Sequence, residues 1–256
     1  MPTPAPATQA INLAGNGYMS KQTDVNEKMR AILIDWLVEV HLKFKLMVET
    51  LYLTVNLIDR FLEKEPITRN KLQLVGVTAM FLASKYEEIY APECRDFVYI
   101  SDRAYTREQI LQMEAKMLQT LGFHLTAPSA FVFLKRMLKL SSTYFTSTPS
   151  TKTALLATYL VELTLQEYSF LKFPASTVAA SALYLALGTL GAKQCAWGPE
   201  LQSWYSEEDL RPCVRELHEL HVKHFGCACT LRAVHRKYSQ EKQGAVASIP
   251  PLDSVK

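Results

Sequence analysis

Hydrophobic positions recur along this chain at helical spacing, and one stretch is apolar around its whole circumference. From Leu72 to Ser84 the sequence carries no charge, and at about 100° per residue its apolar side chains cover every side of a helix. The run is too short to span a bilayer, which needs about 20 apolar residues, so other helices must bury it. The next residues are Lys85, Tyr86, Glu87 and Glu88. We therefore predict a core helix whose charged end is either solvated or faces a partner.

Capping residues and prolines predict further helices on both sides of this core helix. The pattern gives helices over about 25–45, 49–65, 92–100, 106–122, 128–140, 151–168, 174–190, 200–205 and 206–225. Asp24 or Asn26 can cap the first, Pro66 ends the second, and Thr106 with Gln109 forms a capping box. Because few segments alternate with the period of a strand, the predicted fold class is all-α.

An internal repeat organises these helices. At a constant offset of 103 residues, the alignment pairs Leu53 with Leu156, Leu57 with Leu160, Ile58 with Val161 and Asp59 with Glu162. Segments 78–83 and 181–186 align at the same offset, and 105–110 matches 205–210. Three matches in the same order indicate a duplication of a five-helix domain. We expect a flexible N-terminal tail over 1–20, domains over 21–125 and 126–238, and a C-terminal tail over 239–256.

Composition narrows the classes of ligand. The net charge is +3 on 28 basic and 25 acidic residues, with no dense run of Lys and Arg, so nucleic acid is not an expected ligand. The first ten residues lack the basic and apolar regions of a signal peptide, and neither secretion nor a membrane partner is expected. The five cysteines form no CxxC pair and are expected to be free thiols.

We find no constellation typical of an enzyme. The sequence has no glycine-rich phosphate loop, GxSxG or HExxH motif. His218, His221 and His224, followed by Cys227 and Cys229, could be drawn as a metal cluster. Steps of three residues leave the first and third histidines about 120° apart on a helix, which favours a solvated or groove-lining face. We therefore expect no metal, no cofactor and no catalytic activity.

The helix over 29–40 is apolar on two sides. One side carries Met29, Ile32, Leu33, Trp36 and Val40, and the opposite side carries Ala31, Ile34 and Val38. Two apolar sides require two partners. One is the core of the domain, and the other is either a neighbouring helix or a groove for a ligand peptide.

Arg30 and Asp59 are isolated charges in apolar surroundings. Each would cost several kcal/mol to bury alone, so an ion pair between them is the economical hypothesis. Such a pair would be structural rather than catalytic.

Five segments resemble a known family: MRAILIDWLVEV, NLIDRFL, KLQLVGVTAMFLASKYEEIYAPE, DFVYISDRAYTREQILQMEAKMLQTLGF and RKYS. They look like the cyclin box of the mitotic A/B-type cyclins, and LASKYEE is nearer the B-type wording. The resemblance covers about residues 18–250. It implies a non-catalytic regulatory subunit that binds and activates a cyclin-dependent serine/threonine kinase, docks Arg-x-Leu substrate or inhibitor peptides and controls G2/M progression.

The resemblance also assigns roles to residues. The five positions that mark the first box of the family fall on Arg30, Leu33, Asp59, Lys85 and Glu114. By resemblance, the kinase contacts are Lys85, Glu114, Leu82, Tyr86, Leu118 and Phe123. The substrate-docking patch would comprise Met29, Ile32, Trp36 and Leu72, flanked by Glu39 and Gln73. Apolar sockets suit a leucine, and a carboxylate suits an arginine.

The chain departs from the family pattern in two respects. A helix before the box and a longer arm with a destruction signal are not recognisable, so the chain is either a fragment or differs in turnover and in part of its kinase interface. Arg30–Leu33 and Arg69–Leu72 match a minimal Arg-x-x-Leu signal, but both lie in or beside predicted helices and are expected to be structural.

Two other functions remain open. One is a cyclin-box transcription factor or adaptor, against which the near-neutral charge argues. The other is a metal-dependent helical hydrolase that uses the His218 cluster. A nuclear and cytoplasmic location is carried over from the family.

Overall fold

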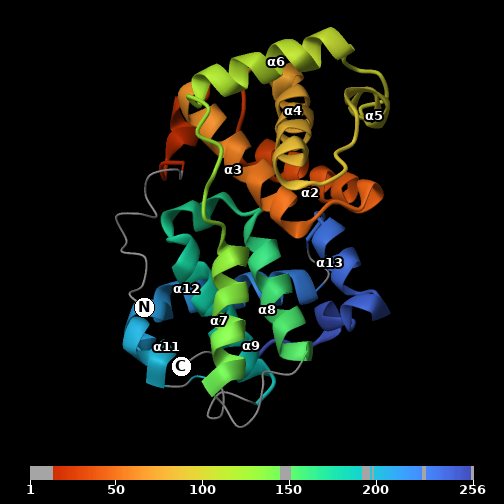
Figure 1. Cartoon of the computed structure of the whole chain (residues 1–256). Helices are drawn as coiled ribbons and strands as arrows, with labels where there is room; N and C mark the ends of the chain where they lie inside the picture. Colours follow the sequence, from red (N-terminus) through yellow and green to blue (C-terminus); the bar gives the residue numbers. More distant parts are fainter. Residues whose placement is uncertain (1–13, 145–150, 192–196, 198, 227–228, 255–256) are drawn as a thin grey trace. The chain divides into compact units, whose positions relative to one another are not determined.

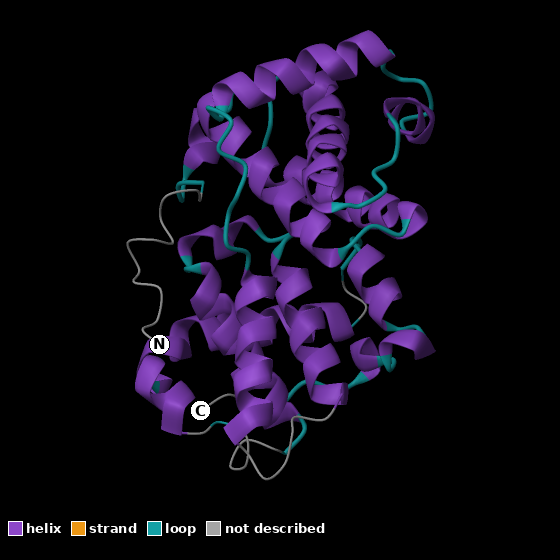
Figure 2. Cartoon of the chain, in the orientation of Figure 1, coloured by secondary structure: helices purple, strands orange, loops and turns teal. Residues whose placement is uncertain are grey.

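The computed structural model describes residues 14–144, 151–191, 197, 199–226 and 229–254 (Figure 1). Every regular element in these ranges is a helix, as Figure 2 shows, and the all-α prediction is confirmed. None of the described helices is long and apolar enough to cross a membrane. The chain divides into two compact units, of which the first runs through Ala127 and also takes in Leu165–Lys172. The second unit holds Pro128–Thr164 and the chain from Phe173 onward.

The first unit is built around the predicted core helix. Its elements are η2 (Tyr18–Lys21), α2 (Glu27–Phe44), α3 (Val48–Lys64), α4 (Arg69–Glu87), α5 (Cys94–Ile100), α6 (Arg107–Thr120) and η3 (Tyr168–Lys172). Helix α4 packs against α2, α3, α5 and α6, which surround it in Figure 1. Its residues from Leu74 to Ser84 are all buried. At Gly76 an added Cβ would lie 2.7 Å from Leu33 Cδ1, so this glycine permits the close approach of α2.

Caps explain where several of these helices begin. Asn26, rather than Asp24, caps α2, because its Oδ1 accepts a hydrogen bond from Met29 N at 3.0 Å. Asp24 instead accepts from the backbone N of Arg69 at 2.7 Å, at the start of α4. The capping box of Thr106 and Gln109 is present at the start of α6 and is confirmed.

The second unit repeats the plan around α9. Its elements are α7 (Ala130–Tyr144), α8 (Thr151–Thr164), α9 (Ala175–Thr189), α11 (Pro199–Trp204), α12 (Glu207–Phe225), α13 (Ala233–Tyr238), η4 (Glu241–Gln243) and η5 (Val246–Ser248). Helix α9 packs against α7, α8 and α12, as α4 packs in the first unit. The predicted helix over 151–168 ends at Thr164, because Gln166 bonds Asp35 and Tyr168 packs on Tyr18 of the first unit.

The repeat extends to the buried polar groups. Asp59 is 2% exposed and accepts hydrogen bonds from Arg30 and the Tyr18 hydroxyl. Its counterpart Glu162 is fully buried and accepts from Lys237 at 2.7 Å and from the Tyr238 hydroxyl at 2.8 Å. In each unit, one cation therefore neutralises the buried carboxylate and one tyrosine hydroxyl donates a hydrogen bond to it.

Both segments expected to be tails are packed where the structure describes them. Residues 1–13 lie outside the described residues, but Tyr18 of η2 is only 2% exposed, and Met19 N donates to the Tyr168 hydroxyl at 2.9 Å. At the other end, Val246 is fully buried. These segments are short and have no helical periodicity, so the sequence pattern did not predict that they are packed.

His218, His221 and His224 of α12 do not form the solvated face that the sequence favoured, because His221 and His224 are buried. His218 Nε2 lies 2.7 Å from the carbonyl oxygen of Leu252, and His221 is fully buried. Among the described residues, no group of three His, Cys, Asp or Glu side chains is arranged to hold a metal ion. Cys195 and Cys227 lie outside those residues.

Candidate functional site

Arg30 and Asp59 meet in the core of the first unit. Arg30 Nε lies 2.6 Å from Asp59 Oδ1, and Nη2 lies 2.7 Å from Oδ2. The third nitrogen, Nη1, donates to the carbonyl oxygen of Leu165 at 3.0 Å. Burial is the largest single influence and would lower the pKa of Arg30, but the Asp59 carboxylate and Tyr18 together outweigh it and raise the pKa. The guanidinium therefore stays charged, and the pair joins α2 to α3.

The polar part of the predicted kinase contact lies at the end of the core helix. Lys85, in the last turn of α4, forms an ion pair with Glu114 of α6. The Lys85 side chain is 43% exposed, its ammonium lies 4.3 Å from the centre of the Phe81 ring, and the Glu114 side chain is only 11% exposed. The structure thus brings both residues together with only Lys85 well exposed.

Apolar side chains stand out around this ion pair. Tyr86 is 49% and Phe123 69% exposed, while Leu118 is half-buried and Leu82 is 5% exposed. Phe123 has φ 61°, a left-handed conformation that a residue with a Cβ rarely adopts. Its backbone N donates to the carbonyl oxygen of Leu118 at 2.9 Å, so this conformation closes the end of α6 and leaves the ring exposed.

Sequence reasoning missed two exposed residues beside these. Ile89 is 88% and Tyr90 is 93% exposed, directly after the end of α4. Their signal in the sequence was an apolar pair that follows the charged end of the core helix. We define the kinase face as the predicted six residues plus these two: Leu82, Lys85, Tyr86, Ile89, Tyr90, Glu114, Leu118 and Phe123.

The second apolar side of α2 is only partly free. Ile32 is 50% exposed and Met29 and Trp36 are half-buried, but Leu33 and Val40, which periodicity assigned to the same side, are 6% and 3% exposed. Glu39 is exposed and Gln73 is half-buried. Leu72 is 5% exposed, so it can form only the base of the predicted docking patch.

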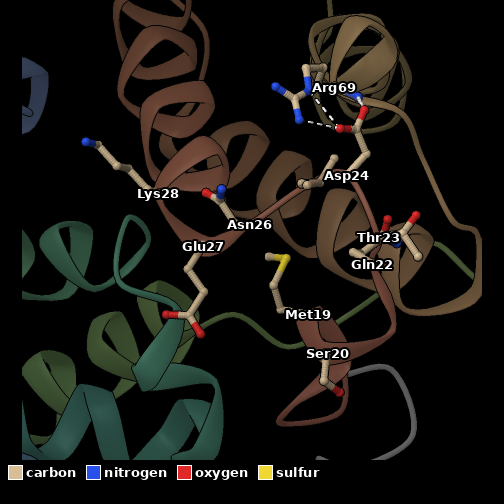
Figure 3. Close-up of a pocket in the computed structure, with 10 residues that line it drawn as sticks. Met19, Ser20, Gln22, Thr23, Asp24, Asn26, Glu27, Lys28 and Arg69 are labelled. Carbon is tan, nitrogen blue, oxygen red and sulfur yellow. Dashed lines mark hydrogen bonds and ion pairs between the residues drawn. The ribbon is translucent and has the colours of Figure 1, made fainter.

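A shallow hollow lies where α2 and α4 begin. It is lined by Met19, Ser20, Gln22, Thr23, Asp24, Val25, Asn26, Glu27, Lys28 and Arg69. Figure 3 shows Asp24 and Arg69 joined at one side, with Glu27 and Lys28 pointing away from them. The Asp24–Arg69 pair, at 2.6 Å, is largely exposed on the Arg69 side. Its charges are balanced, and it offers no set of groups arranged for acid–base or nucleophilic chemistry.

Comparison with protein families covers nearly the whole chain. The profile "Cyclin, N-terminal domain" matches residues 6–126, and "Cyclin, C-terminal domain" matches residues 128–252. The chain belongs to the cyclin family.

Curated relatives of this cyclin carry mitotic names. Cyclin-B2-1 of Oryza sativa subsp. japonica is 50% identical over 235 residues, which cover 91% of this chain and 54% of the relative. G2/mitotic-specific cyclin-2 of Medicago sativa is 48% identical, with 91% and 69% covered. The resemblance to mitotic, B-type cyclins is confirmed. This cyclin spans about half the length of the first of these relatives.

Solved structures share the fold of this cyclin. A viral cyclin from herpesvirus saimiri matches with a TM-score of 0.73 and 20% identity, covering 84% of this chain and 93% of that one. A chain of the yeast RNA Pol II CTD kinase CTDK-1 complex matches with a TM-score of 0.66 and 15% identity, covering 96% and 86%. The prediction of two tandem cyclin boxes is confirmed.

Proposed function

We propose that this cyclin is the non-catalytic regulatory subunit of a cyclin-dependent serine/threonine kinase and acts at G2/M. The observation that carries the proposal is the kinase face, where the C-terminal ends of α4 and α6 expose apolar side chains and α4 and α6 are joined by the Lys85–Glu114 ion pair. A group of exposed aromatic and aliphatic side chains with a central charge pair is the usual anatomy of a protein-binding hot spot. The G2/mitotic-specific names of relatives support the timing.

The proposed mechanism is a shift in the conformational population of the kinase. The kinase alone favours an inactive arrangement, and this cyclin binds the active arrangement better. Its kinase face would hold the mobile helix of the kinase inward, which completes the Lys–Glu pair that positions the ATP phosphates, and would draw the activation loop open. The cyclin contributes no catalytic atom and needs no cofactor.

The packing of the kinase face suits this role. Part of it is anchored on α4, whose residues between Leu74 and Ser84 are all buried, so this part of the face is held by a core helix. A surface that is already ordered loses little conformational entropy on binding, which leaves more of the contact energy to bias the kinase.

We also propose that the exposed side of α2 docks Arg-x-Leu peptides of substrates or inhibitors. Ile32, Met29 and Trp36 would receive the leucine, with Leu72 as the base of the socket. Glu39 is exposed on the same helix and would pair with the arginine, with Gln73 flanking the peptide. A nuclear and cytoplasmic location belongs to the same proposal, and neither nucleic acid nor a membrane is among the proposed partners.

The test is activation of a purified monomeric cyclin-dependent kinase of the mitotic class, measured as phosphorylation of a histone-type peptide. The wild-type chain should activate it strongly. Phe123→Ala, which removes a ring that is 69% exposed, should raise the Kd for the kinase by roughly 30-fold, equivalent to about 2 kcal/mol. The double variant Lys85→Ala, Glu114→Ala should lose activation while its helicity stays near normal.

Val222 provides a matched control. It is 44% exposed on α12 of the second unit, outside the kinase face, so Val222→Ala should leave activation unchanged. Absence of both activation and complex formation by the wild type would contradict the proposal and would leave the transcription-factor and adaptor functions.

A further inference from the structure

Glu88 lies at the exposed end of α4, yet its side chain turns back into the unit. Its backbone N donates to the carbonyl oxygen of Ser84 at 2.9 Å, which makes it the C-cap of α4. Its Oε1 accepts hydrogen bonds from Met47 N at 2.7 Å and from the hydroxyl of Thr50. The last acidic residue of the charged end is therefore bound to the start of α3.

Helix α3 needs an acceptor at this place. Its N-cap, Met47, has no side-chain oxygen and makes no side-chain capping bond. In a capping box, the third residue of the helix sends a carboxylate back to the N-cap N–H. Here that third residue is Thr50, which donates to the carboxylate of Glu88 instead. A carboxylate also complements the positive end of the helix dipole.

The other side of Met47 is fixed as well. Its carbonyl oxygen lies 3.1 Å from Nε2 of His41, and the Leu46 N donates to the His41 carbonyl oxygen at 3.1 Å. The α2–α3 turn is thus held from α2 on one side and from the end of α4 on the other. Glu88 is the residue that joins this turn to α4.

The residues next to Glu88 belong to the kinase face. Tyr86 precedes it by two positions, and Ile89 and Tyr90 follow it directly. Because Ile89 and Tyr90 are 88% and 93% exposed, packing does little to fix their direction. The direction in which the chain leaves α4 is fixed instead at Glu88.

Glu87 offers a contrast at the adjacent position. It is half-buried, and burial, followed by the charges of Glu49 and Glu88, raises its pKa. Like charges that crowd one another are unfavourable, and of the two adjacent acids Glu88 is the one in the capping geometry.

We propose that Glu88 is a positioning residue of the kinase face, which orients Ile89 and Tyr90 by capping α3 and does not itself bind the kinase. The inference rests on the proposed kinase-binding function. On this inference, the carboxylate of Glu88 pre-organises part of the kinase face, which is largely exposed before the kinase binds.

The experiment measures the Kd of the full chain for the purified kinase, together with far-UV circular dichroism and the thermal midpoint of each variant. Glu88→Ala should raise the Kd by about tenfold, because the charged acceptor of the cap is lost. Glu88→Gln keeps an acceptor oxygen and should remain within about threefold of the wild type. Thr50→Val removes one donor to the cap and should also weaken binding. The double variant Glu88→Ala, Thr50→Val should be no weaker than Glu88→Ala alone.

Two matched variants separate positioning from a general loss of stability. Glu87→Ala removes the adjacent charge, and Asp24→Ala removes the carboxylate that bonds the opposite end of α4 at Arg69 N. Both should bind the kinase as the wild type does. A rise in Kd for Asp24→Ala that matches the one for Glu88→Ala would overturn the inference.

The remaining outcomes distinguish the two proposals. If Glu88→Gln binds as poorly as Glu88→Ala while Thr50→Val binds normally, Glu88 contacts the kinase directly and the inference is wrong. If the wild type binds, Phe123→Ala weakens binding and Glu88→Ala does not, the inference alone fails. If the wild type does not bind, the proposed function fails.

Discussion

Replacement of Asp59 by alanine should destabilise the first unit by about 3–5 kcal/mol. The carboxylate accepts three hydrogen bonds, two from Arg30 and one from the Tyr18 hydroxyl, at 2.6–2.7 Å. Without it, a guanidinium that is 1% exposed loses its only paired carboxylate and retains neutral acceptors such as the carbonyl oxygen of Leu165. The cost is therefore mainly that of a buried charge left unpaired rather than of the lost bonds.

Two further variants test whether the loss of stability comes from the unpaired charge of Arg30. Tyr18→Phe removes one hydrogen bond to a charged acceptor and leaves the ion pair, so it should cost about 1.5–3 kcal/mol. The double variant Arg30→Met, Asp59→Leu removes both charges and should recover most of the loss, because two apolar side chains carry no desolvation penalty. The double variant is thus expected to be more stable than Asp59→Ala.

The assay is urea unfolding combined with amide hydrogen exchange. Exchange is read from individual peptides of the chain, so it reports protection in the two units separately. Asp59→Ala should lower protection in α3, whereas Glu162→Ala, which removes the equivalent carboxylate, should lower it in α8. A loss below about 1 kcal/mol for Asp59→Ala, or a double variant less stable than the single one, would refute the unpaired-charge reasoning.

Three further outcomes follow from the same structure. Burial, with the nearby His218, lowers the pKa of His221 to about 4. The unfolded chain therefore takes up a proton first as the pH falls. The free energy of unfolding of the second unit, measured in urea, should fall by up to about 3 kcal/mol between about pH 6.5 and 4, with a flatter profile in His221→Leu. Gly76→Val should cost about 1–3 kcal/mol in thermal unfolding, because its Cβ would lie 2.7 Å from Leu33 Cδ1. Trp36→Ala should slow phosphorylation of an Arg-x-Leu substrate by about tenfold and leave a short peptide without that motif unaffected.

Periodicity and caps predicted most of the fold, because burial dictates residue type in a core. The uncharged run from Leu72 to Ser84 is buried as expected except at Gln73, and the residue that the repeat aligns with Asp59, Glu162, is a second buried carboxylate. Periodicity failed where packing does not follow a helix. The segment at Tyr18 and the segment around Val246 are buried through single side chains and short turns, which leave no repeating pattern in the sequence.

The site could be predicted only in part. Arg30 and Asp59 were identifiable as a pair because two isolated charges in apolar surroundings must find partners. The kinase face was assigned by resemblance, and Ile89 was missed because an exposed apolar residue outside a helix breaks no physical rule. The capping role of Glu88 was not predictable either, since its partners lie about 40 positions away in the chain.

The two units share a buried carboxylate but differ at the end of the central helix. The buried carboxylate is present in both, because an unmatched one would cost its unit several kcal/mol. The end of the central helix is not repeated: in the first unit Lys85 pairs with Glu114, and Glu88 accepts a hydrogen bond from Met47 N. Aligned at the offset of the repeat, Lys85-Tyr86-Glu87-Glu88 of α4 faces Gly188-Thr189-Leu190-Gly191 at the end of α9. The second unit therefore repeats the fold without the charged end, and Lys85, which the resemblance assigns to the kinase face, has no charged counterpart there.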